Sequence, residues 1–288
     1  SGNTLFNILF LTKWYPNYKD KQIGVFVRKH AKAVAEICNV SLLYVSAHDA
    51  IKEKFKTEIS EQNFFEVIIY YRNSSFKIIN AFRKFSAYRK GLKIISNKNG
   101  RPDLIHLNIL VKHGFVALLL KKLKGIPYII TEHWTGYASG KFSRMNYLEK
   151  YWCKKIAENA KAITLVSHSL KKSVAEAGIK NHFFVIPTVV DIPHAISTSK
   201  NEKKIIASVT DLEDDLKNIS GTIRAIARIE RIKNKFEFHI IGGGSDESKL
   251  KSLAKELGLI NKTVFFHGMQ TNDYVYEFLK RTDFLVVN

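Results

Sequence analysis

The sequence is poor in cysteine and in long apolar runs, and each shortage excludes a class of protein. The two cysteines, Cys38 and Cys153, can build neither a disulfide framework nor a four-cysteine zinc site, so we expect a reducing, cytoplasmic compartment. No apolar run reaches the roughly 18 residues that a membrane-spanning helix needs. The apolar stretch over residues 5–11 is short and no basic region precedes it, so it predicts a first strand rather than a signal peptide.

Several catalytic and ligand-binding signatures are also missing. The chain contains no G-x-G-x-x-G, no G-x-x-x-x-G-K-[ST], no G-x-S-x-G and no H-E-x-x-H. One cluster of carboxylates invites a metal interpretation, but it lacks the ligand spacing of a calcium loop. We therefore predict a solvated acidic loop and no bound metal at Asp211, Glu213, Asp214 and Asp215.

Acidic residues are scarce in the first two thirds of the chain. Residues 1–190 carry 31 Lys/Arg against 12 Asp/Glu, a net of +19, whereas residues 191–288 carry 15 against 14. Between Arg72 and Arg101 there are nine basic residues and no acidic one. A field of one sign attracts an anionic partner such as a membrane, a nucleic acid or a phosphorylated acceptor.

A helix predicted over residues 78–96 carries much of this charge. Apolar residues recur in it at helical spacing, at Ile78, Ile79, Phe82, Phe85, Leu92 and Ile95. The basic residues beside this stripe are Lys77, Arg83, Lys84, Arg89, Lys90 and Lys93. The combination favours a helix on an anionic membrane surface, with a core-packing helix as the alternative. Nucleic acid is not expected as a partner, because no nucleic-acid-binding motif accompanies the charge.

The alternation of apolar strands and helical patterns predicts an α/β protein with parallel sheets covered by helices. In a first domain over residues 1–190 we expect strands at 5–11, 40–46, 65–71, 104–106, 128–131, 162–166 and 183–186. Helices are expected between them at 25–37, 78–96, 111–123, 147–159 and 169–177.

A second series of elements follows a proline-containing, polar linker at residues 191–202. In this second domain, residues 203–288, strands are expected at 204–209, 236–241, 263–267 and 284–287, and helices at 221–232, 248–257 and 274–280. No helix follows the last strand, so we expect this domain to be incomplete.

Glycine-rich junctions between strands and helices are the clearest ligand-binding signal. The strand FEFHII ends in Gly242, Gly243 and Gly244, directly before a helical pattern. Glycines there allow a tight turn and let a ligand approach main-chain N–H groups, which is how α/β proteins hold phosphates. His267-Gly268 repeats the theme at the next strand.

Four further residues stand at similar junctions between strands and helices. Gly24 precedes the first helix and Lys217 precedes a helix of the second domain, where its charge suits a diphosphate. Glu132 and His133 end a strand beside two aromatic residues, a set that suits a sugar through stacking and hydrogen bonds. An ordinary loop at Gly24 and a packed loop with a satisfied histidine at His133 are the alternatives.

The order and spacing of these motifs resemble the retaining GT-B glycosyltransferases of family 4, also called glycosyl transferases group 1. In the first domain the similar stretches are Trp14-Tyr15-Pro16 with Gly24, the strand end at 131–133, the Val-Ser at 166–167 and the hinge at 185–191. In the second domain they are Lys217-Asn218 and the segments 240–244 and 264–268.

The resemblance implies two Rossmann-like doubly wound domains, the second incomplete. It implies transfer of a sugar from a nucleotide-diphosphate donor, with retention, to a saccharide or lipid-linked saccharide acceptor in glycan biosynthesis, without a metal or other cofactor. His133 and Glu132 would then lie at the catalytic site. The donor would be bound by Gly24, Lys217, Gly242, Gly243, Gly244, His267 and Gly268, and the basic helix would face the acceptor or the cytoplasmic side of a membrane.

Two departures from the family pattern weaken the expected donor site. The segment Val209-Thr210-Asp211 lacks the arginine that partners the lysine, and the paired glutamates of the E-x7-E motif would lie beyond Asn288. We therefore expect weakened donor binding. A non-enzymatic nucleotide-sugar or glycan-binding protein of the same fold and a UDP-sugar epimerase stay open as alternatives.

Overall fold

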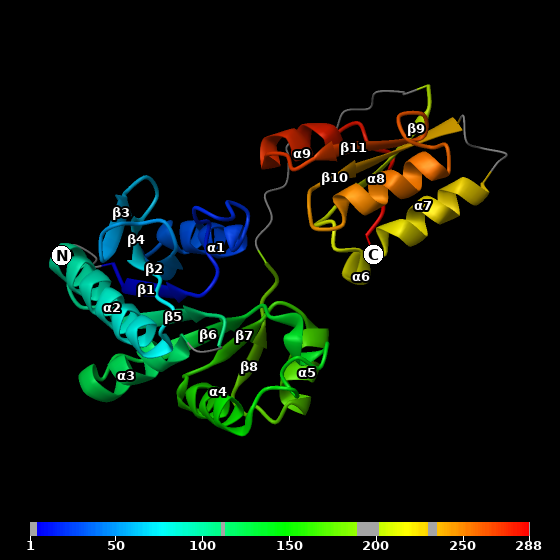
Figure 1. Ribbon diagram of the computed structural model, residues 1–288. Helices are drawn as coiled ribbons and strands as arrows, with labels where there is room; N and C mark the ends of the chain where they lie inside the picture. Colours follow the sequence, from blue (N-terminus) through cyan, green and yellow to red (C-terminus); the bar gives the residue numbers. More distant parts are fainter. Residues whose placement is uncertain (1–4, 111–112, 189–201, 230–234, 288) are drawn as a thin grey trace. The chain divides into compact units, whose positions relative to one another are not determined.

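Eight described strands of the first unit form one sheet in the order β3-β4-β2-β1-β5-β6-β7-β8 (Figure 1). Every neighbouring pair is parallel except β3 with β4. The strands are β1 (Asn7–Thr12), β2 (Asn39–His48), β3 (Phe55–Ser60), β4 (Phe65–Arg72), β5 (Leu104–Asn108), β6 (Tyr128–Glu132), β7 (Ile163–Leu165) and β8 (Phe183–Val185).

The computed structural model describes residues 5–110, 113–188, 202–229 and 235–287. The chain divides into two units, Ser1–Val190 and Asp191–Asn288, and each is described by itself. Residues 191–201 of the predicted linker lie outside the described residues.

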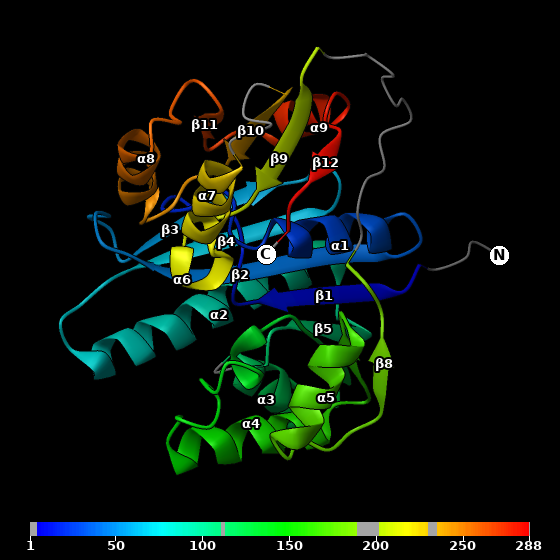
Figure 2. The same ribbon diagram turned by 90° about the vertical axis from the view of Figure 1, so that its right-hand side faces the viewer.

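Helices of the first unit cover the two faces of its sheet unequally (Figure 2). One face packs on α1 (Val25–Ala35), through a core that includes Phe10, Val27 and Leu42. The other face, with the larger core, packs on α2 (Lys77–Asn99), α3 (Gly114–Lys124), α4 (Tyr147–Asn159) and α5 (His168–Glu176), and the short helix η1 (Thr135–Tyr137) lies between β6 and α4. Every crossover from β4 onward steps along the sheet in one direction, so right-handed connections place α2 to α5 on one side.

The second unit has a four-stranded parallel sheet in the order β11-β10-β9-β12. Its strands are β9 (Lys204–Val209), β10 (Phe236–Ile241), β11 (Val264–Gly268) and β12 (Phe284–Leu285). The helices are α6 (Asp214–Lys217), α7 (Ile219–Arg228), α8 (Glu247–Glu256) and α9 (Asn272–Leu279). Leucine and isoleucine side chains of α7 and α8 pack on one face of the sheet, and Phe278 of α9 packs on the other.

The structure confirms the predicted α/β class with two largely parallel sheets, and it adds an antiparallel strand, β3, to the first. The sequence of β3, FKTEIS, has no apolar run, and half of its positions are exposed, so it carries only a weak strand signal. It forms the edge of the sheet, where charged side chains are tolerated because one side faces solvent. The helix predicted over 221–232 begins at Ile219, and residues 230–232 lie outside the described residues.

Candidate functional site

The loop after β1 packs tightly on itself, and Gly24 makes this possible. Gly24 has φ +70°, and a Cβ there would lie 2.2 Å from the Trp14 carbonyl oxygen. The loop is also held by Thr12, whose hydroxyl donates to the same carbonyl at 2.8 Å. Packing within the first unit therefore requires a residue without a side chain here. This is a structural reason for the glycine, in addition to the predicted approach of a ligand.

Glu132, at the end of β6, is buried and serves as an anchor for its loop. Its Oε1 accepts hydrogen bonds from the N–H groups of His133 and Trp134, both at 2.9 Å. Its Oε2 accepts from the Leu110 N–H and the Tyr137 hydroxyl, both at 3.1 Å. Burial raises the pKa of the Glu132 carboxyl, while these bonds act in the opposite direction. A carboxylate whose two oxygens accept four bonds positions its neighbours rather than binding a ligand.

His133, the next residue, presents an unused polar atom. Its ring lies near those of Phe26 and His30 on α1, with centroid separations of 4.3 Å and 5.6 Å. Burial, together with the charge of a protonated His30, lowers the pKa of His133 to about 4, so the ring is neutral near pH 7. Its buried Nε2 has no hydrogen-bond partner among the described residues. Because buried polar atoms are normally paired, this nitrogen is an irregularity at the end of β6.

Two further irregularities lie at the same edge of the sheet, at the end of β5. Asn108 is fully buried and its Oδ1 has no partner among the described residues. The next residue, Ile109, has φ +70°, a conformation that costs a β-branched residue on the order of 1–3 kcal/mol. Asn108 lies opposite Thr131 in the register, two residues before His133. Sequence reasoning missed both, because neither amide pairing nor backbone strain leaves a pattern in the sequence.

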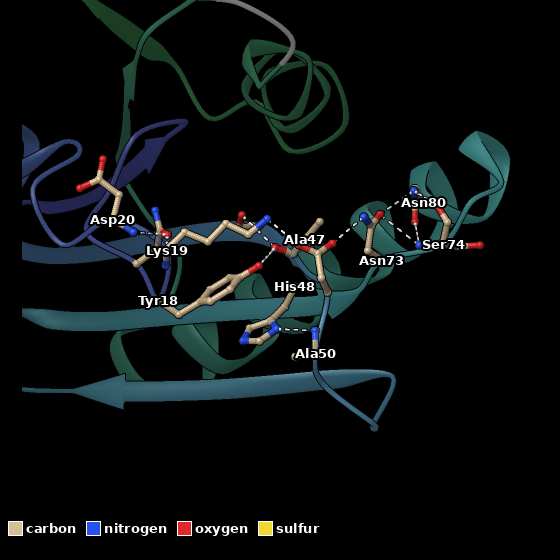
Figure 3. A network of polar contacts seen from close by, with 12 residues as sticks. Tyr18, Lys19, Asp20, Ala47, His48, Ala50, Asn73, Ser74 and Asn80 are labelled. Carbon is tan, nitrogen blue, oxygen red and sulfur yellow. Dashed lines mark hydrogen bonds and ion pairs between the residues drawn. The ribbon is translucent and has the colours of Figure 1, made fainter. Parts of the chain in front are cut away.

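A polar and aromatic network joins the carboxyl ends of β1, β2 and β4 (Figure 3). The Tyr18 ring stacks on His48 at 3.6 Å between centroids, and Lys19 pairs with Asp49 at 2.5 Å. Asn73 donates to Asp49 at 2.8 Å and accepts from the amide of Asn80, at the start of α2, at 2.9 Å. This network was not predicted from the sequence, because its residues come from four separate segments.

The basic residues predicted on α2 differ in their surroundings. Lys77, Arg89, Lys90 and Lys93 are exposed. Arg83 is half-buried and donates to the main-chain carbonyls of Arg72, at 2.7 Å, and Asn73, at 3.4 Å. Lys84 is also half-buried. Arg83 therefore fastens α2 to the end of β4, and the exposed four form the accessible basic face.

In the second unit the glycine triplet lets two loops touch at the backbone. Gly242 has φ +144°, and a Cβ there would lie 1.9 Å from the Thr210 carbonyl oxygen. A Cβ on Gly244 would lie 2.6 Å from the Leu212 carbonyl oxygen. Gly243 is different, with its nearest neighbour, Met269, 3.6 Å from such a Cβ. Within the described residues, the main-chain N–H groups of Gly243 and Gly244 donate no hydrogen bond. Both can therefore donate to a ligand beside the N-terminus of α8.

Lys217 is a half-buried cation with neither an ion pair nor a side-chain hydrogen bond in the described part of the chain. Two carboxylates of the second unit, Asp214 and Asp246, bind main-chain N–H groups and not Lys217. Asp214 accepts from the Ser220 N–H at 2.8 Å, and the Asp214 N–H donates to Asp246 at 2.8 Å. A second cation, Lys249 in the first turn of α8, lies close enough to lower the pKa of Asp214; sequence reasoning missed it.

His267 has both ring nitrogens occupied within the second unit. Its Nε2 lies 2.9 Å from His239 Nδ1, and its Nδ1 lies 2.8 Å from the Tyr274 hydroxyl. His239 in turn reaches Glu237 at 3.2 Å. As placed, His267 serves the packing of α9 rather than a ligand, whereas Gly268, with φ +66° and open space around it, leaves the strand end accessible.

Neither a metal centre nor a membrane span emerges from the described ranges. No group of three or more His, Cys, Asp or Glu side chains is arranged there to hold a metal ion. Likewise, each helix in those ranges is too short or too polar to cross a bilayer. The four carboxylates near residue 211 accordingly show no arrangement of ligands in the structure.

Comparisons with known proteins identify both units. Residues 23–193 match the family model described as Glycosyltransferase Family 4, and residues 190–288 match the model described as Glycosyl transferases group 1. No curated protein sequence matches the chain significantly.

Solved structures of similar fold are glycosyltransferases or their complexes. Sucrose-phosphate synthase from Thermosynechococcus elongatus has a TM-score of 0.69 and 16% identity over 98% of this chain and 75% of that chain. A lipopolysaccharide outer core galactosyltransferase has a TM-score of 0.63 and 17% identity over 98% and 74%. A trehalose-6-phosphate structure from E. coli with bound UDP-2-fluoro glucose has a TM-score of 0.64 and 10% identity over 98% and 78%. With a family model covering more than half of its length, the chain belongs to glycosyltransferase family 4 and is a glycosyltransferase of the GT-B fold.

Proposed function

We propose that this glycosyltransferase moves a sugar, with retention at the anomeric carbon, from a nucleotide-diphosphate donor to a saccharide or lipid-linked saccharide acceptor in glycan biosynthesis. The observation that supports the donor most directly is Lys217, a half-buried residue whose ammonium has no partner in the described residues. Its positive charge can therefore pair with an anionic ligand. A diphosphate is the anion that a nucleotide-sugar donor supplies.

Leaving-group stabilisation in this proposal is electrostatic. Negative charge builds up on the diphosphate as the bond to the sugar breaks, and fixed donors that face that charge lower the barrier. Lys217 supplies a full charge, and the N–H groups of Gly243 and Gly244 supply partial charges at the N-terminus of α8. Glu247, in the same turn, is paired with Lys251 at 2.7 Å, which reduces its repulsion of an anion.

His133 is the proposed contact of the first unit with the transferred sugar. Its unpartnered Nε2 suits a hydrogen bond to a sugar hydroxyl, and Phe26 holds the ring from one side. Because its pKa is lowered to about 4, the ring acts as a neutral group and not as a cation near pH 7. Glu132 positions His133 through its main-chain N–H.

Calorimetric titration of the intact chain with UDP and GDP tests the donor assignment. Lys217→Ala is expected to weaken binding of the preferred diphosphate about ten- to hundredfold, as for other lost hydrogen bonds to charged groups. Lys235→Ala is the matched control, because Lys235 is exposed at the opposite end of β10. EDTA is expected to leave the affinity unchanged. Equal affinity in Lys217→Ala and wild type would refute the assigned role.

The anomeric configuration of the product tests retention. With a nucleotide sugar and an accepting saccharide, NMR of the new glycosidic bond is expected to show the donor's configuration. An inverted product would contradict retention but leave the donor site intact. Conversion of the UDP-sugar alone into its epimer would instead support the epimerase alternative.

An anionic membrane is the proposed partner of the first unit, with the enzyme at the cytoplasmic face. Support comes from α2, which contains no acidic residue and exposes Lys77, Arg89, Lys90 and Lys93. Such attraction weakens with salt, because the screening length falls from about 10 Å at 0.1 M to about 3 Å at 1 M. Sedimentation with vesicles containing phosphatidylglycerol is therefore expected to decline between these two salt concentrations. Salt-insensitive or absent binding would count against this partner.

A further inference from the structure

An apolar pocket opens between α2 and α3, and its lining contains none of the candidate site residues at the strand ends. Its volume is ≈ 510 Å³, which lies within the range of about 300–1,000 Å³ that small-molecule ligand pockets occupy. The lining runs from Phe85 to Asn97 on α2, about 18 Å of helix at 1.5 Å per residue. On α3 it runs from Phe115 to Lys124. The pocket is therefore elongated, a shape that suits a chain better than a compact ring.

The charge of the lining says which kind of apolar ligand fits. Arg89, Lys93 and Lys124 line the pocket, and the described lining includes no acidic side chain. Exposed apolar side chains continue from it along the first turns of α2, where Phe82 is 66% exposed and Ile78 84% exposed. An apolar trough with a basic rim matches a molecule with an alkyl chain and an anionic head.

We propose that this pocket takes one acyl chain of an anionic phospholipid, with Arg89 and Lys93 contacting the phosphate. The inference builds on the proposed anionic-membrane partner. It differs in requiring a defined site for a single lipid and not only attraction between charged surfaces.

The neighbouring groove between α3 and α4 provides an internal control. It is smaller, ≈ 210 Å³, and shares Phe115 with the first pocket. Its lining includes Leu148 and Glu149 but no basic residue. An anionic lipid is therefore expected in the α2–α3 pocket and not in this groove.

Monomeric lipid tests the pocket without a membrane. Calorimetric titration of the intact chain with 1-palmitoyl-lysophosphatidylglycerol, below its micelle concentration, is expected to show saturable binding of one molecule. Lysophosphatidylcholine is expected to bind more weakly, and glycerol 3-phosphate, which has no chain, is expected not to compete. Absence of saturable binding by lysophosphatidylglycerol would overturn the proposal.

Variants locate the site. Leu119→Trp fills the pocket from α3 and is expected to weaken binding about tenfold or more, which corresponds to about two methylene groups left in water. Leu148→Trp makes the same change in the control groove and is expected to bind like wild type. Undiminished binding by a folded Leu119→Trp would overturn the proposal.

A milder change keeps the test decisive if Leu119→Trp does not fold. Lys93→Glu, at the exposed rim, is expected to weaken lysophosphatidylglycerol binding more than Lys90→Glu, since Lys90 is also exposed on α2 but does not line the pocket. Equal effects of Lys93→Glu and Lys90→Glu would show that binding depends on surface charge alone, and would overturn the proposed pocket.

Vesicle sedimentation separates the two proposals. Monomer binding without vesicle binding would retain the pocket and refute the membrane partner. Vesicle binding that depends on salt but not on Leu119→Trp, together with no monomer binding, would retain the membrane partner and refute the pocket.

Discussion

Glu132 and His133 are adjacent in the chain, but their surroundings give them different roles. The Glu132 carboxylate accepts four hydrogen bonds and holds the loop. His133 keeps a buried nitrogen without a partner in the described residues. A sequence shows a carboxylate beside an imidazole, but the number of bonds that each atom makes is set by neighbours from Leu110 to Tyr137. The unsatisfied atom, rather than the acidic one, is the better candidate for contact with substrate.

At this scale, replacing His133 separates stability from activity. His133→Phe keeps the ring packed on Phe26 and removes the unpaired nitrogen, so the melting temperature is expected to stay equal or rise. Sugar transfer is expected to fall roughly tenfold or more, as for a lost substrate hydrogen bond, while affinity for the free nucleotide is unchanged. Full transfer activity in this variant would remove His133 from the site.

Three histidines of the first unit predict a loss of stability in acid. Burial is the main cause that lowers the pKa of His106 to about 3 and of His133 to about 4, and it also lowers the pKa of His30. In the unfolded chain these groups take up protons near pH 6.5. The unfolded state then binds more protons than the folded state below that pH, so their contribution to stability is complete above about 6.5 and declines as the pH falls toward 4.

Urea unfolding at pH 7.5 and 5.0 measures this effect. The urea midpoint is expected to be lower at pH 5.0 than at pH 7.5. The His106→Gln variant is expected to show a smaller difference between these two midpoints. His106 contacts Thr131 at 2.5 Å, so the glutamine variant retains a polar partner for that hydroxyl. A midpoint that rises on acidification would contradict the sign of the argument.

At the scale of elements, α2 shows how one helix serves two environments. The stripe predicted from spacing is real, but Ile95 at its end is 1% exposed while Ile78 at its start is 84% exposed. Helical spacing of apolar residues was enough to predict the helix. Whether each residue of the stripe is buried depends on where the sheet ends, and no spacing contains that information.

The glycine turn after β10 yields a matched pair of variants. Gly242→Ala is expected to destabilise the second unit by more than about 1 kcal/mol, because the backbone has φ +144° and the new Cβ would meet the Thr210 carbonyl. Gly243→Ala meets nothing closer than 3.6 Å, so stability is expected to stay nearly unchanged. If a diphosphate approaches the main chain there, Gly243→Ala weakens its binding.

Thermal unfolding followed with UDP or GDP titration distinguishes these outcomes. A Gly243→Ala variant with normal stability and normal nucleotide affinity would show that the ligand does not approach this turn. Equal stability of Gly242→Ala and wild type would contradict the packing described for it.

At the scale of the molecule, the chain combines two units with different charge and different tasks. The first carries nearly all of the net charge of +20 and the eight-stranded sheet. The second is nearly neutral and holds Lys217 and the glycine turn. The charge therefore points to the first unit for anionic surfaces and acceptors, and the local donors point to the second unit for the nucleotide.

Scanning calorimetry of the intact chain is expected to show two unfolding transitions, one for each unit. A nucleotide diphosphate at about a hundredfold excess over its dissociation constant is expected to stabilise the second unit by about 2.7 kcal/mol and to leave the transition of the first unchanged. Lys217→Ala is expected to remove most of the shift. A nucleotide-induced shift confined to the first unit's transition would contradict the assignment of the donor site.

The sequence by itself determined the class of fold, the order of most elements and the family, because these follow from local periodicity, glycine positions and charge. Tertiary structure decided which polar atoms are satisfied, because hydrogen bonds such as those of Glu132 and the pairing of His239 with His267 join segments distant in the chain. It also decided that Gly24 and Gly242 are required by backbone packing. That the side chains of His133 and Lys217 lack partners among the described residues follows only from the folded structure, since the absence of a partner is a property of the surroundings and not of the residue.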